Sequence, residues 1–282
     1  MKQSNITKWW CGLLGVITFI VASMPNAHAG RGIYGVSEYA DPGPFYQGKA
    51  RDSRCNSLFL FTLKVYSGGS INYGSDATPL CKNGSYIGNS VWDQQLNGCR
   101  GGSISRIEMC IGEWGSSAFD SIRTRINSDG TGSGTILFRN FNALKNKIRL
   151  DAFQMDDEKT YDRSTMVRFC KMLKDGMGVW VSLCPYTNQS FWAGVKSDLP
   201  DRVTDVWLQC YDGGAGNSAT NWRSALSNTS LIRPGATIFD GPTKATQRYR
   251  DWRNQGFTGA FIWSDKRVPD SQWGQWMING GF

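Results

Sequence analysis

The most informative absence in this chain of 282 residues is histidine, which occurs only once, as His28. That residue lies in an N-terminal segment with the features of a cleaved signal, so the mature chain is expected to have none. Ser-His-Asp and Cys-His catalysis are thereby excluded, as are zinc sites with histidine ligands. Any acid–base chemistry therefore has to be carried by carboxylates, tyrosine or lysine.

The N-terminal segment combines positive charge, a short apolar run and a small-residue cleavage pattern. Lys2 and Lys8 supply the charge, residues 9–22 form the apolar run, and residues 27–29 read Ala-His-Ala. We predict that residues 1–29 are a secretory signal and that the protein is secreted or periplasmic. A retained membrane anchor is the alternative, but the run is short for a span, and no later segment is long and apolar enough to form one.

Other common functional signatures are missing as well. The sequence contains no C-x-x-C pair, so a metal cluster is not expected, and no Gly-rich nucleotide-binding loop follows a predicted strand. Loss of the signal lowers the formal charge from +8 to +6, and no run rich in lysine and arginine stands out. We therefore expect no metal, no cofactor, no nucleic acid partner and no stable membrane anchor in the mature chain.

Seven cysteines follow the predicted signal, and their odd number leaves at least one outside any intramolecular disulfide. Because export permits disulfides, Cys81 and Cys99 could clip the Gly- and Asn-rich connection in which they lie. Cys110, Cys184 and Cys210 lie in apolar, strand-like runs and are expected to be small buried thiols.

Short apolar runs alternate with segments of helical periodicity along residues 30–282. The predicted strands are Ile33–Tyr39, Leu58–Tyr66, Arg106–Gly112, Ile148–Asp156, Gly178–Cys184, Asp205–Tyr211, Ala236–Asp240 and Gly259–Ser264. The predicted helices are Ser117–Asn127, Thr135–Lys147, Ser164–Asp175, Gln189–Leu199, Ala219–Asn228, Thr243–Gln255 and Ser271–Ile278. This alternation indicates an α/β fold with one domain, a (β/α)8 TIM barrel. A doubly wound open sheet is the alternative, and the connection 40–57 is too irregular to predict a full helix.

The stretch Leu150–Glu158 carries carboxylates on an otherwise apolar strand. On an extended strand the side chains alternate, so Gln154, Asp156 and Glu158 share one face while apolar residues occupy the other. The two acids would lie roughly 7 Å apart along that face, and such proximity separates their protonation states. The pattern predicts that one donates a proton while the other stays charged; a solvated acidic turn is the alternative.

With these strands placed, the chain resembles glycoside hydrolase family 18, the chitinases and endo-β-N-acetylglucosaminidases. The family's fourth-strand motif D-x-x-D-x-D-x-E is represented by Asp151, Gln154, Asp156 and Glu158. The other matching motifs are the third-strand S-x-G-G as Cys110-Ile111-Gly112-Glu113, the sixth-strand Gln-x-Tyr-Asp as Gln209-Cys210-Tyr211-Asp212, and the eighth-strand tryptophan as Trp263. The pair Asp157-Glu158 looks more like the endo-β-N-acetylglucosaminidase branch than like the chitinases.

The resemblance implies a retaining mechanism in which the N-acetyl group of the substrate is the nucleophile. Glu158 would protonate the leaving oxygen and later activate water, Asp156 would hold the acetamido N–H, and Tyr211 would hydrogen-bond the acetamido carbonyl. Gln209 and Asp212 would shape the pocket. The aromatic candidates for sugar stacking are Trp263, Trp114, Tyr186 and Trp192. Purely structural roles are the alternatives: Tyr211 and Asp212 could begin the turn at Gly213-Gly214, and Trp263 could pack inside the barrel.

Two positions depart from the family pattern. Gln154 replaces the middle Asp of the acidic motif; it cannot ionise, but it can donate a hydrogen bond to Asp156 and keep that group charged. Glu113 replaces a glycine and adds a carboxylate and bulk beside the expected pocket. We expect turnover to be altered rather than lost, and a Gln154→Asp change to raise the rate or shift its pH optimum.

The sequence thus predicts a secreted glycosidase that cleaves N-acetylglucosamine-containing glycans. The alternative is a catalytically impaired barrel of the same fold that binds a carbohydrate or a protein partner. Retention of Glu158 favours the enzyme, whereas Gln154 and Glu113 favour the binding protein.

Overall fold

Eight parallel strands form the centre of the fold in the computed structural model, which describes residues 30–37, 44–74, 78–264 and 270–282. The predicted signal 1–29 lies outside the described residues. The barrel strands are β1 (Arg31–Ser37), β2 (Ser57–Val65), β6 (Arg106–Ile111), β7 (Ala152–Met155), β8 (Trp180–Leu183), β9 (Val203–Leu208), β10 (Ile232–Thr237) and β11 (Ala260–Trp263). Each of the eight predicted strands overlaps one of these, with shifted ends. The largest shift is at the predicted strand Ala236–Asp240, because Ile238–Asp240 form a short 3-10 helix after β10. The last two residues of the predicted strand Ile33–Tyr39 lie outside the described residues.

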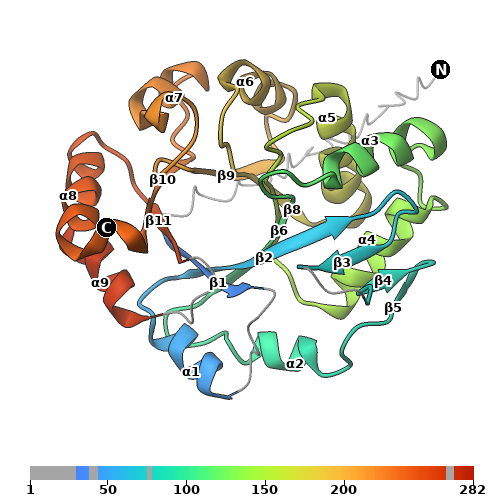
Figure 1. Cartoon of the computed structure of the whole chain (residues 1–282), viewed down its shortest axis with the longest axis horizontal. Helices are drawn as coiled ribbons and strands as arrows, with labels where there is room; N and C mark the ends of the chain where they lie inside the picture. Colours follow the sequence, from blue (N-terminus) through green and yellow to red (C-terminus); the bar gives the residue numbers. More distant parts are fainter. Residues whose placement is uncertain (1–29, 38–43, 75–77, 265–269) are drawn as a thin grey trace, which may run out of the picture.

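The sheet closes on itself, because β1 pairs in parallel with both β2 and β11. The helices form a ring around the strands (Figure 1). They are α3 (Ala118–Asp129), α4 (Ile136–Lys147), α5 (Arg163–Lys171), α6 (Gln189–Asp198), α7 (Ala219–Ala225), α8 (Gly241–Asn254) and α9 (Ser271–Asn279). The predicted (β/α)8 barrel is confirmed, and closure excludes an open doubly wound sheet. None of the described helices is both long enough and apolar enough to cross a membrane.

The region before β6 contains elements that the sequence did not predict. The connection 40–57 holds a helix, α1 (Pro44–Asp52), in which Tyr46 and Ala50 are buried. A second short helix, α2 (Trp92–Asn97), follows further on. The prediction that residues 40–57 lack a full helix was wrong, because two buried positions four residues apart are enough to fix this helix against the barrel.

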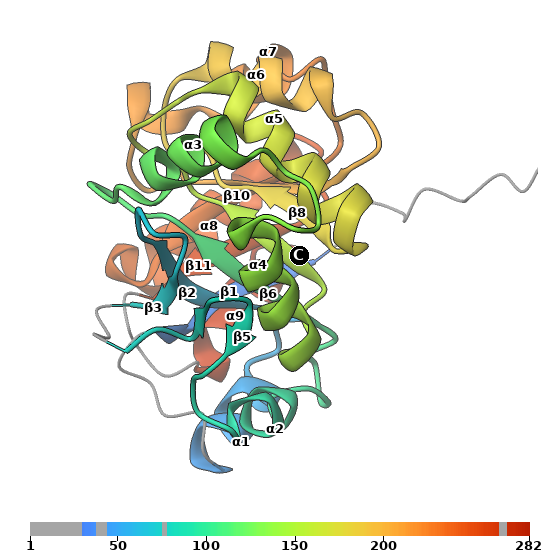
Figure 2. The same ribbon diagram turned by 90° about the vertical axis from the view of Figure 1, so that its right-hand side faces the viewer.

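An antiparallel extension is attached to β2 through β3 (Ile71–Tyr73), β4 (Cys81–Lys82) and β5 (Ser85–Tyr86). It lies against α4 (Figure 2), where the buried Asn140 amide joins two of its turns. Asn140 Nδ2 donates to the Gly69 carbonyl at 2.6 Å, and its Oδ1 accepts from the Gly84 amide at 2.7 Å. The side chain thereby replaces water at two turn peptides and fixes the extension to the barrel.

The seven cysteines among the described residues are all buried, and none of them forms a disulfide. The suggested Cys81–Cys99 disulfide was therefore wrong: Cys81 lies in β4, and the Cys99 thiol faces the carbonyl oxygen of Gln95 at 3.8 Å. The prediction that Cys110, Cys184 and Cys210 are buried thiols is confirmed.

A buried ionic network crosses the barrel interior. The Glu108 carboxylate is 0% exposed and accepts hydrogen bonds from Arg106 Nε at 2.6 Å, from Trp207 Nε1 at 3.1 Å and from the Ser182 hydroxyl. Because these residues belong to β6, β8 and β9, the contacts span the inside of the barrel rather than one strand pair.

Asp205 continues this network toward β10. Its carboxylate lies 3.2 Å from Arg233 Nε and 3.8 Å from an Arg106 nitrogen, and all three side chains are almost completely buried. Three aromatic rings also fill the interior: Phe261 packs edge to face against both Phe59 and Trp207, and the Phe59 and Trp207 rings are tilted by 60° to each other. This filled interior provides a rigid floor on which the carboxyl ends of the strands present their side chains.

Candidate active site

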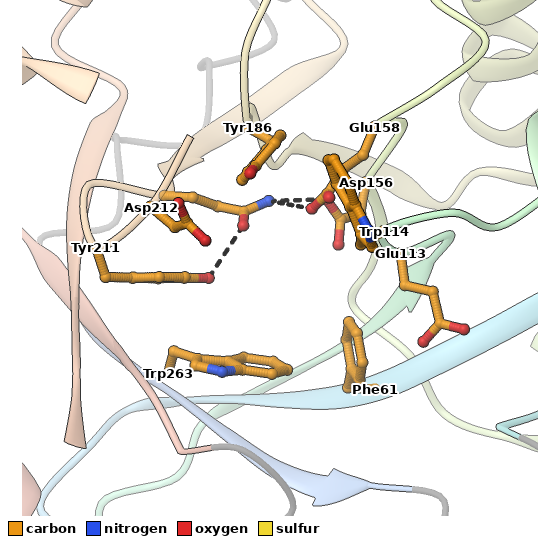
Figure 3. A pocket seen from close by; sticks show the side chains of 10 residues that line it. Phe61, Glu113, Trp114, Asp156, Glu158, Tyr186, Tyr211, Asp212 and Trp263 are labelled. Carbon is orange, nitrogen blue, oxygen red and sulfur yellow. Dashed lines mark hydrogen bonds between the residues drawn. The ribbon is translucent and has the colours of Figure 1, made fainter. Parts of the chain in front are cut away.

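A pocket of about 470 Å³ opens where the barrel strands end. Its walls contain nine of the eleven candidate residues, together with Phe61 (Figure 3). Those nine are Glu113, Trp114, Asp156, Glu158, Tyr186, Gln209, Tyr211, Asp212 and Trp263. Gln154 is not among the lining residues: it is 0% exposed within β7, in register between Cys110 of β6 and Ser182 of β8. Trp192 is also buried at 0% exposure, so the suggestion that it stacks on a sugar was wrong.

The two acids lie just beyond the end of β7, which stops at Met155. The Asp156 amide donates to the Ile111 carbonyl at 2.9 Å, which extends the β6–β7 pairing by one residue. Gly112 permits this close approach, because a Cβ at that position would lie 2.3 Å from the Asp156 carbonyl oxygen. Its φ of 91° also favours glycine. The glycine of the third-strand motif thus sets how deeply Asp156 sits.

Gln209 connects the acids to the tyrosine. Its Nε2 donates to Asp156 Oδ1 at 2.9 Å and to Glu158 Oε1 at 3.0 Å, while its Oε1 accepts from the Tyr211 hydroxyl at 3.2 Å. Figure 3 shows these bonds as a bridge across the pocket. The sequence assigned the hydrogen bond to Asp156 to Gln154, but the amide that makes it in the structure comes from Gln209 at the end of β9.

Burial changes the acidity of both carboxyl groups. Burial raises the pKa of Asp156 well above its ordinary value, and the neighbouring charge of Glu158 raises it further. Burial also raises the pKa of Glu158, while hydrogen bonds from Gln209 and Asp156 act in the opposite direction. Because both pKa values are raised, the two carboxyl groups keep their protons to a higher pH than free carboxyl groups would.

These raised pKa values predict that stability declines as the pH rises. The folded state binds more protons than the unfolded state here, so the free energy of unfolding falls with increasing pH. The stabilising contribution is complete below the unfolded pKa of Asp156 and is lost as the pH passes its folded pKa. We expect Asp156→Asn, which is neutral at every pH, to flatten this decline. At neutral pH its Tm should rise by about 2–4 °C for each kcal/mol that the substitution adds to the free energy of unfolding. Calorimetry from about pH 4 to about pH 8 measures both slopes; equal slopes in the two proteins would contradict the assignment.

Aromatic rings form the opposite wall of the pocket. Tyr211 and Trp263 lie nearly parallel, with ring centroids 6.3 Å apart and an interplanar angle of 17°, and Phe61 meets Trp263 edge-on at 4.8 Å. Burial raises the pKa of the Tyr211 hydroxyl well above its ordinary value, so the group stays protonated and able to donate. The partly exposed indole of Trp263 offers an apolar surface of the kind on which sugar rings stack.

Glu113 does not block the pocket. Its Oε1 lies 2.7 Å from Lys64 Nζ, and Figure 3 shows its carboxylate turned away from Asp156 and Glu158. Lys64 balances the additional negative charge that Glu113 brings to this wall.

Asp157 is a buried carboxylate that sequence reasoning did not assign to the site. It is 2% exposed and accepts hydrogen bonds from the backbone amides of Lys159, Thr160 and Tyr161 at 3.1, 2.8 and 2.8 Å. These bonds fold the chain after β7 into a tight turn, and the turn fixes the direction in which the Glu158 side chain points. Its position directly before Glu158 was the signal available in the sequence.

Asp157→Ala is expected to lower kcat by about 10- to 100-fold with a smaller change in KM, because a misplaced Glu158 loses its reacting geometry. Asp157→Asn keeps one acceptor oxygen and should fall between the native protein and the alanine variant. Asp162→Asn is the matched control, since that carboxylate caps α5 through the Thr165 amide at 2.7 Å in the same loop. Steady-state kinetics test whether Asp157 positions Glu158. An equal loss of kcat in the Asp162→Asn control would show that Asp157 only stabilises the loop.

Asn217 is a second supporting residue that the sequence analysis missed. Its Nδ2 lies 2.6, 2.8 and 2.9 Å from the carbonyl oxygens of Tyr186, Gln209 and Asp212, and the residue is 1% exposed. The side chain thereby holds the loops after β8 and β9 together at the pocket wall. Asp212 lines the pocket and also accepts from the Gly213 amide at 2.8 Å, so it combines both roles weighed from the sequence.

The residues in the described part of the chain include no cluster of three or more histidine, cysteine or carboxylate side chains arranged to hold a metal ion. The pocket presents two carboxyl groups, a tyrosine hydroxyl and a side-chain amide. Two carboxyl groups of raised pKa, one of them partly exposed, suit general acid–base catalysis.

Neither a protein-family model nor a curated protein matches the sequence. Solved structures do match most of the chain. A fungal endo-β-N-acetylglucosaminidase of glycosyl hydrolase family 18 has a TM-score of 0.66 at 10% identity, covering 89% of this chain and 96% of that one. The Bacillus cereus spore cortex-lytic enzyme SleL has a TM-score of 0.64 at 13% identity, with 89% and 74% covered. A family GH18 chitinase from Cycas revoluta, in complex with allosamidin, has a TM-score of 0.63 at 10% identity, with 88% and 99% covered.

The chain has a family 18 glycoside hydrolase fold. The resemblance found in the sequence motifs is thus confirmed at the level of the fold, although those motifs are short and the overall identity is low. Seven of the residues matched by motif line one pocket at the end of the barrel where TIM-barrel active sites lie: Glu113, Asp156, Glu158, Gln209, Tyr211, Asp212 and Trp263.

Proposed function

We propose that the protein is a glycosidase that cleaves N-acetylglucosamine-containing glycans by substrate-assisted, retaining catalysis. The observation that carries the proposal is the arrangement of Glu158, Asp156, Gln209 and Tyr211 in one hydrogen-bonded chain along the pocket. The likeness to an endo-β-N-acetylglucosaminidase and to chitinases supports this class of substrate.

In this proposal Glu158 is the residue that transfers the proton. It is more exposed than Asp156, and its raised pKa lets it keep its proton to a higher pH than a free carboxyl group would. A sugar lying on Trp263 would direct its acetamido group toward Asp156 and Tyr211. The protonated Tyr211 hydroxyl would donate to the acetamido carbonyl, while Asp156 would accept from its N–H. The acetamido oxygen would then attack the anomeric carbon as Glu158 protonates the departing oxygen, and Glu158 would later deprotonate the incoming water.

Release of reducing sugar from chitin oligosaccharides and from high-mannose glycoprotein tests the activity directly. Proton NMR of the first products shows whether the anomeric configuration is retained. The same oligosaccharide without its N-acetyl groups should be cleaved at least about 100-fold more slowly, because the internal nucleophile is missing. Equal cleavage with and without those groups would rule out substrate assistance.

The binding-protein alternative makes a distinct prediction in the same assay. It requires measurable glycan binding together with sugar release that stays at background in the native protein and in Glu158→Gln alike. Gln154 and Glu113, the two positions that differ from the family pattern and favoured a binding protein, leave the pocket open. Gln154 is buried outside the pocket, and the Glu113 carboxylate pairs with Lys64.

A further inference from the structure

A cavity of about 380 Å³ lies at the amino ends of the barrel strands, at the opposite end of the barrel from the active-site pocket. Its walls come from the start of β1, the segment before β11, the end of α8 and the residues after α9: Gly30, Arg31, Arg253, Thr258, Gly281 and Phe282. The residues that line the active-site pocket are different ones. The volume lies within the range of small-molecule sites, about 300–1,000 Å³. The basal cavity, as we call it, is therefore large enough for a ligand that has no contact with the active site.

Arg31 is held in place at the wall of the basal cavity. Its backbone amide donates to Asn56 Oδ1 at 2.8 Å, and its Nε donates to the carbonyl oxygen of Arg54 at 2.6 Å. These bonds use one side of the guanidinium group. The two terminal nitrogens make no hydrogen bond within the described residues, so their N–H groups remain available to a ligand.

Arg253 is held in a similar way from α8. Its Nη1 donates to the carbonyl oxygen of Phe257 at 3.2 Å, and its other nitrogens make no hydrogen bond within the described part of the chain. Gly281 makes room for the stem of this side chain, because a Cβ at position 281 would lie 3.0 Å from Arg253 Cγ. The φ of 96° at Gly281 also favours glycine. The backbone thus positions a second guanidinium group whose remaining donors are not used inside the protein.

Thr258 adds a hydroxyl group to the same cavity. Its oxygen accepts a hydrogen bond from Nη1 of the buried Arg233 at 3.3 Å. Since the oxygen already accepts from a cation, the hydroxyl directs its own proton elsewhere. Thr258 is exposed, so a ligand in the cavity can receive that proton.

The basal cavity is positively charged. The ion pairs of the described residues use other arginines and lysines, so neither Arg31 nor Arg253 is neutralised by a carboxylate there. The two guanidinium groups outweigh the main-chain carboxylate of Phe282, so the net charge remains positive. A cavity with this charge attracts anions.

The number of donors favours one class of anion. Arg31, Arg253 and Thr258 bring three donor groups from three separate segments, and a phosphate monoester has three strong acceptor oxygens. A carboxylate has two, so one donor group would lack a partner of its own. The planar fork of arginine also fits two oxygens of a phosphate group.

An apolar wall completes the basal cavity. Phe282 is partly exposed, and its ring is held edge-on by Tyr249 with centroids 6.2 Å apart. The cavity is larger than a bare phosphate ion requires, so the body of a small organic molecule can pack against this ring.

We propose that the basal cavity binds a small organic phosphate, whose phosphate group is held by Arg31, Arg253 and Thr258 and whose body contacts Phe282. Binding at this site leaves the active-site pocket open, because the two lie at opposite ends of the barrel. The proposal does not depend on glycosidase activity, and binding alone tests it.

The experiment is calorimetric titration of the full chain with glucose 6-phosphate, inorganic phosphate, glucose and gluconate in a buffer free of phosphate. Glucose 6-phosphate should bind most tightly and inorganic phosphate more weakly, while glucose should not bind measurably. Gluconate, which has a carboxylate in place of the phosphate, should bind about tenfold or more weakly than glucose 6-phosphate. Equal affinity for gluconate or for glucose overturns the phosphate assignment, and equal affinity for inorganic phosphate overturns the organic part of the ligand.

Arg253→Gln should weaken the binding of glucose 6-phosphate by about tenfold or more, because hydrogen bonds to charged groups are lost. Arg253→Lys keeps the charge without the fork and should fall between this variant and the native protein. Arg250→Gln is the matched control: Arg250 is exposed on the same helix, donates to Gln247 Oε1 at 3.1 Å and does not line the cavity. An equal loss in Arg250→Gln would reduce the effect to net surface charge and overturn the site.

Two further measurements keep the test decisive. Thr258→Val removes the hydroxyl at an exposed position, and it should weaken glucose 6-phosphate binding while Tm without ligand stays within about 2 °C. Unchanged binding in both Thr258→Val and Arg253→Gln overturns the proposal. Vesicles of equal parts phosphatidylcholine and phosphatidylglycerol distinguish the source of the phosphate. Binding to these vesicles that Arg253→Gln abolishes, without binding of glucose 6-phosphate, would assign the group to a lipid headgroup and overturn the soluble ligand.

Discussion

Replacing Glu158 by glutamine is expected to lower kcat by about 10²- to 10⁴-fold, the contribution usual for a positioned general acid and base. Glutamine keeps the size of the side chain and can still meet Gln209, which lies 3.0 Å from Glu158 Oε1, but it cannot release a proton. The change removes transition-state stabilisation rather than binding, so KM should change far less than kcat. Sugar release measured over several substrate concentrations separates the two parameters.

Asp129→Asn provides the control for this experiment. Asp129 is a partly exposed carboxylate at the end of α3 that pairs with Arg125 at 3.3 Å, and it does not line the active-site pocket. Its loss should leave kcat within about twofold of the native value, since surface substitutions of this kind have small effects. Activity of Glu158→Gln close to that of this control would remove Glu158 from the proposed chemistry.

Removing the carboxylate of Glu108 is expected to have the largest effect on stability. Glu108 is fully buried, and it accepts hydrogen bonds from Arg106, Trp207 and Ser182 inside the barrel. Glu108→Ala leaves the guanidinium of Arg106 with Asp205, 3.8 Å away, as its remaining ion-pair partner among the described residues. Breaking a buried pair in this way costs about 3–5 kcal/mol, which corresponds to a loss of about 6 to 20 °C in Tm.

A paired substitution distinguishes lost charge balance from lost volume. Glu108→Leu combined with Arg106→Met replaces both charged groups by apolar side chains of similar size, and such exchanges are often close to neutral. We expect the double variant to recover most of the stability lost in Glu108→Ala, as measured by urea unfolding monitored by circular dichroism. If the double variant is as unstable as the single one, the cost lies in packing rather than in the ion pair.

The barrel was predictable because its strands repeat one pattern. In β6, for example, the apolar residues at 107, 109 and 111 alternate with residues whose side chains face the inside of the barrel. Similar runs recur along the chain at the spacing of a βα unit. Helix α1 escaped prediction because it has few buried positions, and the extension β3–β5 because its strands contain only two or three residues. Elements that short are specified by their contacts rather than by local periodicity.

The residues of the candidate site were predictable from the sequence, but their hydrogen-bond partners were not. Motif positions identified residues that the structure gathers in one pocket, but they did not specify which amide faces the acids. Gln154 and Gln209 have the same chemistry, and only the closed barrel shows that Gln209 reaches across to Asp156 and Glu158. The interior charges Arg106 and Glu108 were not recognised either, because a charged side chain on a strand normally indicates a solvent-facing position.

The state of the seven cysteines has a practical consequence for making the protein. Burial raises the pKa of Cys55, Cys81, Cys99 and Cys210 to about 12, so these side chains stay in the unreactive thiol form at physiological pH. Formation of the barrel therefore requires neither an oxidant nor an isomerase. Bacterial cytoplasm, with its reducing glutathione pool, should yield the same folded barrel as an oxidising export route.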